Sequence, residues 1–572
     1  MRLARAGAVC VAALLVAPCL AGDDPFPNLI LKRDLHTSRA SRPPVEGTQA
    51  RMEAAFGELA VGFDCGTPFL LGLRSGPPSP ELDLLSEPPA LAEEAIWIGA
   101  DGRVAVHYTS GRSSADAVPS FDRNRNGVPD YVEAVAAGVS DALAAAERAG
   151  FQPRAAAVDV YVANLAGIAR GFTVPAPRPA KGVAFLVLDS RLYGDEALLK
   201  AVAAHQASHA VLATYDLDEP AWWHEATAAY IETIAERSTL RHADAMNRLL
   251  ANPEQGILVP NSAALTFGAG GLLWTSYLVE STGGRPDILA QIWEEEAIVE
   301  GDNFLEATER ALGMRGRSLA SAFADFTTWS LFTGPRDDAQ HYSFGPVLDE
   351  PLAASPSAAA QSSASPSGRP VAPLGWSLVK LESDGAGGGV IVAFEGAEPG
   401  DWQADLLLST RRRPQSFSRA QLAVGPSGRA TLGVPWGDST EAFLLVRNVR
   451  PSGPAAGFSY AVSPAPGYPF EIASLSAEPE AHGEEWSVRV VWETESEDGL
   501  HGWDVYRSEG RGHFQRVSEI SIPAVGGLDG PVAYQFLDTS VQAGSLYQYY
   551  VVGLTNEGLT QRSFAVTTRI PR

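Results

Sequence analysis

Cysteine is scarce in this chain, which has three in 572 residues. Cys10 and Cys19 lie in an apolar stretch near the start, so Cys65 stands alone in the rest of the sequence. A single remaining cysteine excludes an intramolecular disulfide framework. Secreted proteins that lack disulfides often need another stabilising cross-link, and a bound metal ion can provide one.

Basic residues are also few, with 43 Lys and Arg against 68 Asp and Glu and a formal net charge of -25. Phosphate backbones and anionic lipid headgroups are bound by basic surfaces. This charge therefore argues against a nucleic-acid partner and against electrostatic binding to a membrane. The composition does not decide whether the partner is a peptide or another extracellular or cell-surface ligand. It does not decide the oligomeric state either.

Long apolar runs are missing after the first twenty residues, so no transmembrane segment is expected. Near the start, Arg2 and Arg5 precede the apolar stretch 7–20, and Ala21 offers a small residue before a cleavage point. These features are typical of a cleaved signal peptide over residues 1–21. We therefore predict a secreted, extracellular protein, with attachment to the cell surface as an alternative.

The length is too great for one hydrophobic core and predicts several domains. Residues 22–95 are rich in proline and polar residues, and we interpret them as a lead-in or pro-segment. In residues 96–350 strand signals come first and helix signals follow, which favours an α+β domain. An Ala/Ser/Pro linker over 351–370 precedes two regions, 371–466 and 471–572, whose short strands between Gly/Pro turns predict two all-β sandwich domains.

Two histidines in the α+β region are spaced for a metal site. His205 and His209 lie four residues apart in a helical stretch, so their imidazoles project from one face. Glu225 lies early in the next predicted helix, which returns over the histidine pair if the two helices are antiparallel. Two histidines and one glutamate around an open fourth position is the arrangement of catalytic zinc. The sequence therefore predicts Zn²⁺ on His205, His209 and Glu225.

The segments that carry these residues resemble those of a known family. His-Gln-Ala-Ser-His at 205–209, followed by Trp-Trp-His-Glu-Ala-Thr-Ala at 222–228, resembles the gluzincin metallopeptidases. More narrowly, the chain is similar to a bacterial family of secreted metalloprotease-type proteins over about residues 100–345. The resemblance implies a zincin-like metalloprotease domain of the hydrolase class at 96–350, with the same three zinc ligands.

One residue departs from the family pattern. Gln206 stands where the family has the glutamate that serves as general base for the zinc-bound water. A glutamine amide does not accept that proton at neutral pH. Whether the chain is an enzyme is therefore uncertain, and the main hypothesis is a zinc-binding pseudoprotease or strongly impaired peptidase. The alternatives are an active metallopeptidase with a surrogate base and a non-catalytic extracellular adhesion or binding protein.

A further glutamate is expected behind the zinc ligands. Glu232 follows Glu225 by seven residues and therefore shares its helix face. We expect Glu232 to support a ligand histidine from the second shell.

A second metal site is predicted upstream, in a twelve-residue loop that matches the EF-hand pattern. Side-chain oxygens stand at positions one, three, five and nine, a glycine stands at position six, and a glutamate closes the loop. The loop therefore predicts a structural Ca²⁺ site. Its expected ligands are Asp122, Asn124, Asn126, the carbonyl of Val128, Asp130 and Glu133.

The last region resembles a fibronectin type III domain. The resemblance rests on Val488-x-Val-x-Trp492, on the Gly-Trp-Asp-Val-Tyr-Arg segment at 502–507, and on Tyr547 at an expected strand start. It implies a β-sandwich over 471–572 that serves as a spacer or binding module.

Overall fold

A computed structural model describes most of the chain beyond residue 62. The described residues are 50, 63–75, 85–99, 101–152, 157–177, 180–238, 240–259, 264, 268–299, 301–354, 361–362, 369–381, 389–410, 413–435, 439–464, 470–483, 485–497, 500–510, 512–525, 532–555 and 560–571. The predicted signal peptide, 1–21, lies outside these residues. In the described part, no helix combines the length and the apolar character needed to cross a membrane.

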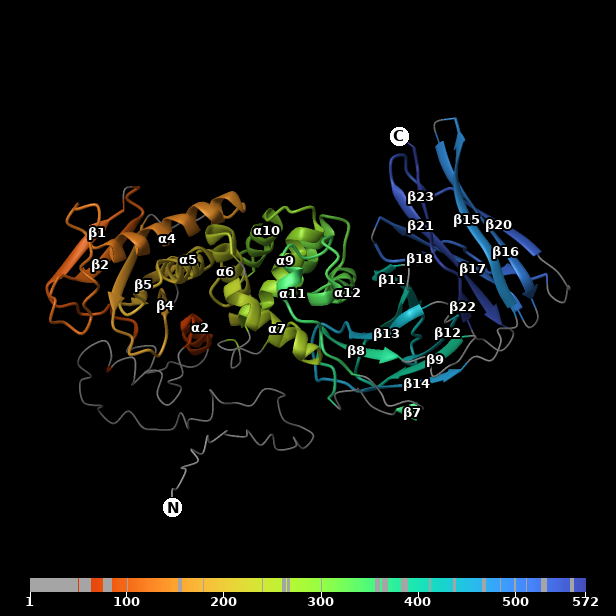
Figure 1. The fold of residues 1–572 in the computed structure, drawn as a ribbon, viewed down its shortest axis with the longest axis horizontal. Coiled ribbons are helices and arrows are strands. Elements are labelled where there is room, and N and C mark those ends of the chain that lie inside the picture. The colour runs from red at the N-terminus through yellow and green to blue at the C-terminus, as the bar shows by residue number, and fades with distance from the viewer. Residues whose placement is uncertain are drawn as a thin grey trace, which may run out of the picture.

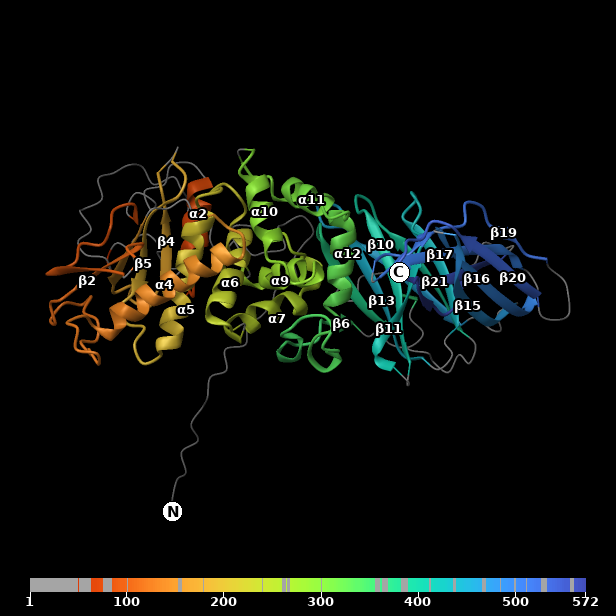
Figure 2. The same cartoon turned by 90° about the horizontal axis from the view of Figure 1, so that it is seen from above.

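The described parts follow one another in a row, as two perpendicular views agree (Figures 1 and 2). A mixed α/β part occupies one end, a group of helices the middle, and β-sheets the other end. The N-terminal sheet has the order β1-β2-β3-β5-β4, with parallel pairing of β2 to β3 and of β3 to β5. Its strands are β1 (Glu94–Ile98), β2 (Val104–Thr109), β3 (Val158–Ala163), β4 (Gly171–Pro175) and β5 (Val183–Asp189).

Two long helices, α4 (Asp130–Arg148) and α5 (Glu196–Leu212), pack beside this sheet, and a third, α6 (Ala221–Glu236), packs on both of them. The Asp195 side chain caps α5 by accepting the Leu198 N–H at 3.0 Å, which satisfies one of the free amides of the first turn. Residues 201–212 of α5 are all buried. Its polar side chains therefore need partners inside the protein.

A short N-terminal segment covers the free edge of the sheet. Phe63 bridges to Ala169, the Gly66 N–H donates to the Gly171 carbonyl at 2.9 Å, and α2 (Thr67–Ser75) follows at once. This segment therefore lies beside β4 and close to α5 and α6.

The middle of the molecule is helical and aromatic. Trp223 of α6 stacks on Trp293 with ring centroids 6.0 Å apart, and Phe304 lies 4.8 Å from Trp223. The elements after α6 are η2 (Leu240–His242), α7 (Ala243–Ala251), η3 (Pro253–Gln255), η5 (Gly268–Gly271), α9 (Leu272–Ser281), α10 (Asp287–Glu296), α11 (Phe304–Gly313), α12 (Leu319–Trp329), η6 (Gly334–Arg336) and η7 (Gly345–Val347).

The first β region has two facing sheets with a hydrophobic cluster between them. One has the order β11-β10-β13-β8-β6, and the other contains β12, β9, β14 and β7. The strands are β6 (Ala353–Ala354), β7 (Gln361–Ser362), β8 (Gly375–Leu381), β9 (Gly389–Gly396), β10 (Trp402–Thr410), β11 (Arg413–Leu422), β12 (Arg429–Pro435), β13 (Ser439–Asn448) and β14 (Phe458–Pro464). Trp376 of β8 packs on Phe326 of α12, so the helices continue into this region without a break in the core.

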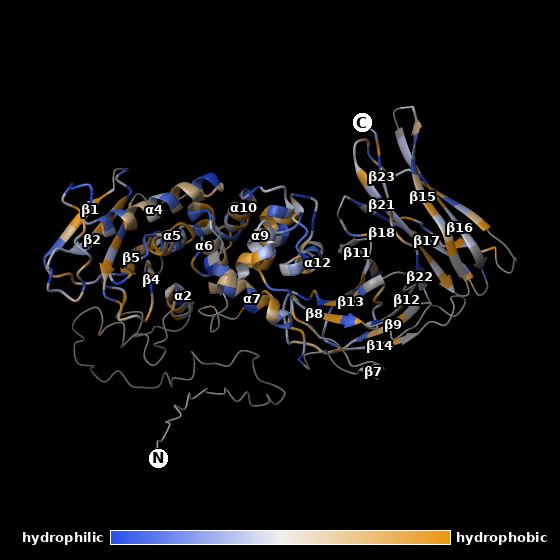
Figure 3. Cartoon of the chain, in the orientation of Figure 1, coloured by the Kyte–Doolittle hydropathy of each residue, from blue (hydrophilic) through white to orange (hydrophobic). Residues whose placement is uncertain are grey.

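The second β region pairs a three-stranded sheet, β15-β16-β20, with strands around β17 and β21. Buried aromatic side chains such as Trp492 and Trp503 fill the space between them, and apolar positions recur along β16 and β17 (Figure 3). A parallel contact of Gly433 with Gln561 joins β12 to β22, so one sheet runs through both regions. The strands are β15 (Phe470–His482), β16 (Glu485–Glu497), β17 (Leu500–Glu509), β18 (Gln515–Arg516), β19 (Ile522–Pro523), β20 (Val532–Asp538), β21 (Leu546–Thr555), β22 (Thr560–Arg562) and β23 (Val566–Arg569).

The broad fold prediction is confirmed: a mixed N-terminal part with α-helices precedes several β-sheet domains. The zincin-like class of the first part, the exact domain borders and the fibronectin type III type of the last part stay predictions.

Candidate metal centre

Helices α5 and α6 bring the three predicted zinc ligands together. Nε2 of His209 lies 2.9 Å from Oε1 of Glu225, and Nε2 of His205 lies 3.5 Å from Oε2 of the same carboxylate. The two Nε2 atoms are 3.2 Å apart. All three side chains are buried, so their lone pairs converge on one small volume away from solvent.

A fourth donor, Cys65, was not among the expected ligands. Its Sγ lies 3.4 Å from His209 Nε2, and donor atoms of Cys65, His205, His209 and Glu225 all lie within 4.8 Å of one another. The only sequence signal was that Cys65 is the single cysteine outside the N-terminal apolar stretch. The position predicted to be open is thus faced by a thiol from the segment that covers the sheet edge.

The donor set fits a metal ion. Glu225 Oε1 is buried and accepts no hydrogen bond from the described residues, although His209 Nε2 is close to it. Burial lowers the pKa of both imidazoles, but the charges of Glu225 and Cys65 outweigh it and raise both pKa values above normal. A cation that binds here must displace these protons, because metal ligands are deprotonated. The buried cluster could therefore hold a metal ion.

Glu232 occupies the supporting position that the helix spacing indicated. Its Oε2 lies 3.0 Å from Nδ1 of His205, on the side of the ring opposite Glu225. The same oxygen accepts from Arg241 at 2.7 Å and lies 2.8 Å from Nε2 of His242. Burial would raise the pKa of Glu232, but His242, Arg241 and these hydrogen bonds hold it well below its usual range. The carboxylate therefore fixes the orientation of the His205 ring.

Gln206 does not face open space. Its Oε1 accepts from the hydroxyls of Thr67 and Thr173, each at 2.9 Å, and its Nε2 donates to Cys65 Sγ at 3.3 Å. Both ends of the amide are therefore engaged within the protein. In this arrangement the amide of Gln206 contacts the thiol of Cys65.

The space beside the histidines is small. A cavity of about 10 Å³ lies next to His209 and His224, with Thr67 and Leu71 of α2 in its wall. Such a volume holds roughly one water molecule. Burial, followed by the charge of His209, lowers the pKa of His224 to about 3, so this imidazole is neutral at ordinary pH. The segment that carries Cys65 thus fills the approach to the cluster.

The predicted calcium loop lies apart from this cluster, before α4. Asn124 and Asn126 both reach the Glu133 carboxylate, at 3.0 and 2.7 Å. Asp122 accepts the N–H groups of Asn126 and Gly127, at 3.1 and 2.8 Å. The loop therefore folds around a centre that faces Asp122, Asn124, Asn126 and Glu133. Asp130, in contrast, accepts from the Arg123 N–H at 2.9 Å.

Comparisons with known proteins give limited information. No protein-family model matches the chain, and no curated protein matches it. Among solved structures the chain is similar to a β-glucuronidase of Bacteroides uniformis, with 13% identity over 34% of this chain and 26% of that one, at a TM-score of 0.16. It is also similar to a GH2 β-galacturonidase of Eisenbergiella tayi, with 12% identity over 34% of this chain and 35% of that one, at a TM-score of 0.16.

A third similar structure is a β-1,2-glucanase of Parabacteroides distasonis, with 11% identity over 32% of this chain and 28% of that one, at a TM-score of 0.13. The chain thus spans about a quarter to a third of the length of the solved structures that it matches. Likeness this weak does not transfer a glycosidase activity to this chain.

These comparisons contradict the function predicted from the sequence, because the matching structures are glycoside hydrolases and not metallopeptidases. The prediction of a metalloprotease-like protein was therefore wrong, both as a pseudoprotease and as an active metallopeptidase with a surrogate base. The geometry supplies a physical reason. The Cys65 thiol lies 3.4 Å from His209 and 3.3 Å from the Gln206 amide, and α2 supplies part of the wall of the small cavity beside His209.

Proposed function

We propose that the chain binds one Zn²⁺ ion in a closed site made by Cys65, His205, His209 and Glu225. The observation that carries the proposal is the convergence of four buried donor atoms from three separate segments. Zinc sites with four protein ligands are structural, whereas catalytic sites keep one position for water or substrate. The function that this geometry supports is therefore metal-dependent stabilisation of the N-terminal fold.

The donor types favour zinc over other cations. Thiolate and imidazole ligands suit Zn²⁺, while Ca²⁺ and Mg²⁺ prefer oxygen donors alone. Burial and the charge of Glu225 raise the pKa of the Cys65 thiol, but the two histidines outweigh them and lower it below its usual value. A lowered thiol pKa favours the thiolate, which is the form that ligates metal.

The role of such a site is to hold the Cys65 segment on the two helices. Cys65 precedes α2, His205 and His209 lie in α5, and Glu225 lies in α6. Metal binding to ligands on separate segments contributes directly to folding free energy. The proposed ion thus adds a link from the segment 63–75 to α5 and α6, whereas its main-chain hydrogen bonds at Phe63 and Gly66 reach residues 168–171.

Metal analysis of the purified full-length chain tests this function. We expect about one zinc per chain, and a strong loss of zinc in Cys65→Ala and in His205→Ala. His107→Ala is the matched control, because His107 is buried against Glu94 and Asp159, away from the cluster. A folded wild-type protein without zinc at neutral pH, or Cys65→Ala with unchanged zinc affinity, would contradict the four-ligand site.

A second metal function is favoured by the loop before α4. We infer that it binds Ca²⁺, because the closing Glu133 reaches back to Asn124 and Asn126 across the loop. Oxygen donors in this spacing match a calcium loop. Calorimetric titration with Ca²⁺ should give binding that Glu133→Gln abolishes. Glu147→Gln, at the far end of α4, should leave it intact, and a wild-type chain that binds no calcium would refute the inference.

A further inference from the structure

Gln206 joins three segments through one side chain. Its carbonyl oxygen accepts hydrogen bonds from Thr67, on the Cys65 segment, and from Thr173, on β4. Its amide nitrogen lies 3.3 Å from the sulfur of Cys65. Gln206 is fully buried, so none of these contacts has water as a competitor.

The neighbouring hydroxyls set the direction of the amide. The Thr67 oxygen already accepts the Thr173 N–H at 2.9 Å, and its own proton is therefore available for the Gln206 carbonyl. With the carbonyl turned to the hydroxyls, the amide N–H must face the sulfur. A thiolate accepts hydrogen bonds and cannot donate them, so this direction suits a metal-bound Cys65.

We propose that Gln206 is a positioning residue that holds the Cys65 thiolate as the fourth metal ligand. This inference rests on the zinc site proposed above. The chemistry favours glutamine at this position, because glutamine donates a hydrogen bond to sulfur and an ionised glutamate only accepts. The residue at 206 is thus matched to the residue at 65, although 141 positions separate them.

Charge balance supports the same pairing. A Zn²⁺ ion with one thiolate and the Glu225 carboxylate is electrically neutral, and the Glu232 carboxylate is paired with Arg241 at 2.7 Å. A glutamate at 206 would add an unpaired negative charge to a fully buried site, against the thiolate. Buried charges without a partner are strongly unfavourable.

A double-mutant cycle with Gln206→Glu and Cys65→Ala tests the proposal, read out by zinc affinity in competition with a chelator. We expect Gln206→Glu to weaken zinc binding about 10- to 100-fold, as for other residues that orient metal ligands. In the Cys65→Ala background the same change should have little effect, because the thiolate that it repels is gone. Gln206→Leu removes the donor to sulfur and the acceptor for Thr67 and Thr173 but adds no charge, so it should cost less zinc affinity than Gln206→Glu.

A spectroscopic measurement separates a positioning role from a general loss of stability. Wild-type protein loaded with Co²⁺ should show sulfur-to-cobalt charge-transfer absorption, and Gln206→Glu should weaken or shift it. Gln561→Glu is the control, because it also places a carboxylate at a buried glutamine, but in the last β region. It should lower the melting temperature without changing the absorption or the zinc affinity.

The outcomes distinguish this inference from the function on which it rests. A wild-type chain that binds no zinc would overturn the proposed function itself. Zinc binding without charge-transfer absorption from Co²⁺ would show that Cys65 is not a ligand and would overturn the four-ligand site together with the inference. A loss on Gln206→Glu that is equally large with and without Cys65 would overturn the inference alone, because the two residues would then act independently.

Discussion

At the scale of single residues, one oxygen atom of Glu232 bears three polar contacts. Its Oε2 meets His205, Arg241 and His242 within 3.0 Å. Replacing Glu232 by Gln removes the charge that orients His205 and leaves Arg241 buried without its partner. We expect zinc affinity to fall about 10- to 100-fold, measured by chelator competition.

The control for this change is Glu236→Gln, one turn further along α6. Glu236 is half-buried, and among the described side chains its carboxylate makes no hydrogen bond with the ligand histidines. Its replacement should change zinc affinity less than about threefold. Equal losses in both variants would mean that general changes in charge, and not the contact with His205, control binding.

A second residue-scale prediction concerns pH and Glu296. This side chain is fully buried near Glu219, and burial raises its pKa well above the usual range. Burial also raises the pKa of Glu219 to about 8. A carboxyl with a raised folded pKa binds more protons when folded than when unfolded, so it lowers stability as pH rises above about 4.5.

Glu296→Gln should therefore stabilise the protein at pH 8 and change it much less at pH 5, as measured by urea unfolding. The gain should be on the order of 1–3 kcal/mol, since one pKa unit corresponds to about 1.4 kcal/mol. Glu294→Gln, on the same helix but exposed, should show no such dependence. A constant difference between wild type and Glu296→Gln across this range would contradict the assignment.

At the scale of elements, the helix that carries the histidine pair is held by a close contact with α4. A Cβ atom added at Gly138 would lie 2.5 Å from the carbonyl oxygen of Lys200 in α5. We expect Gly138→Ala to destabilise the protein by about 1–3 kcal/mol, since overpacking forces the helices apart. Gly313→Ala in α11 meets no atom within 4 Å and should be neutral or stabilising, because alanine favours helix. Urea unfolding measures both.

Helices α5 and α6 show what the sequence could and could not predict. The pairing of His205 with His209 and the support from Glu232 follow from helical spacing, which is local information. Cys65 carries no such signal, because it reaches the cluster only when its segment pairs with the sheet edge more than 100 residues away. The long-range contact of Gly433 with Gln561 could not be predicted either, because the register between strands far apart in the chain depends on the whole folded structure.

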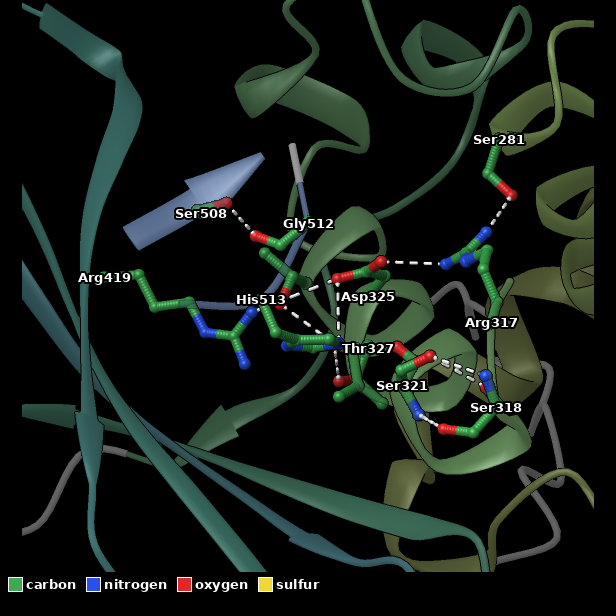
Figure 4. A network of polar contacts seen from close by, with 12 residues as sticks. Ser281, Arg317, Ser318, Ser321, Asp325, Thr327, Arg419, Ser508, Gly512 and His513 are labelled. Atoms are coloured by element: carbon green, nitrogen blue, oxygen red, sulfur yellow. Dashed lines mark hydrogen bonds and ion pairs between the residues drawn. The ribbon is translucent and has the colours of Figure 1, made fainter. Parts of the chain in front are cut away.

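At the scale of the whole molecule, a buried polar network joins the helical part to both β regions (Figure 4). Asp405 of β10 is ion-paired with Arg447 of β13 and, at 2.8 Å, with Arg419 of β11. Arg447 also donates to Thr328 of α12 at 3.0 Å. His513, between β17 and β18, contacts the Ser321 carbonyl of α12 at 2.7 Å. Asp325 of α12 links these contacts, because it lies 3.3 Å from His513 and 4.0 Å from Arg419.

The carboxylate of Asp405 holds both arginines of this junction, and its loss tests whether the junction stabilises the fold. Burial would raise its pKa, but Arg419 and Arg447 outweigh burial and lower it to about 2. Asp405→Asn leaves two buried guanidinium groups without their counter-charge, and we expect a loss of about 3–5 kcal/mol in urea unfolding at pH 7.

Because a carboxylate with a lowered folded pKa stabilises above its unfolded pKa, the difference between wild type and Asp405→Asn should shrink as pH falls from about 4 toward 2. Glu395→Gln breaks an exposed pair with Arg429 and should cost less than about 1 kcal/mol at any pH. If both variants lost the same small amount, the β regions would be held by their apolar contacts alone. A large loss of unfolding free energy in Asp405→Asn alone would instead show that the buried charges hold the three parts together.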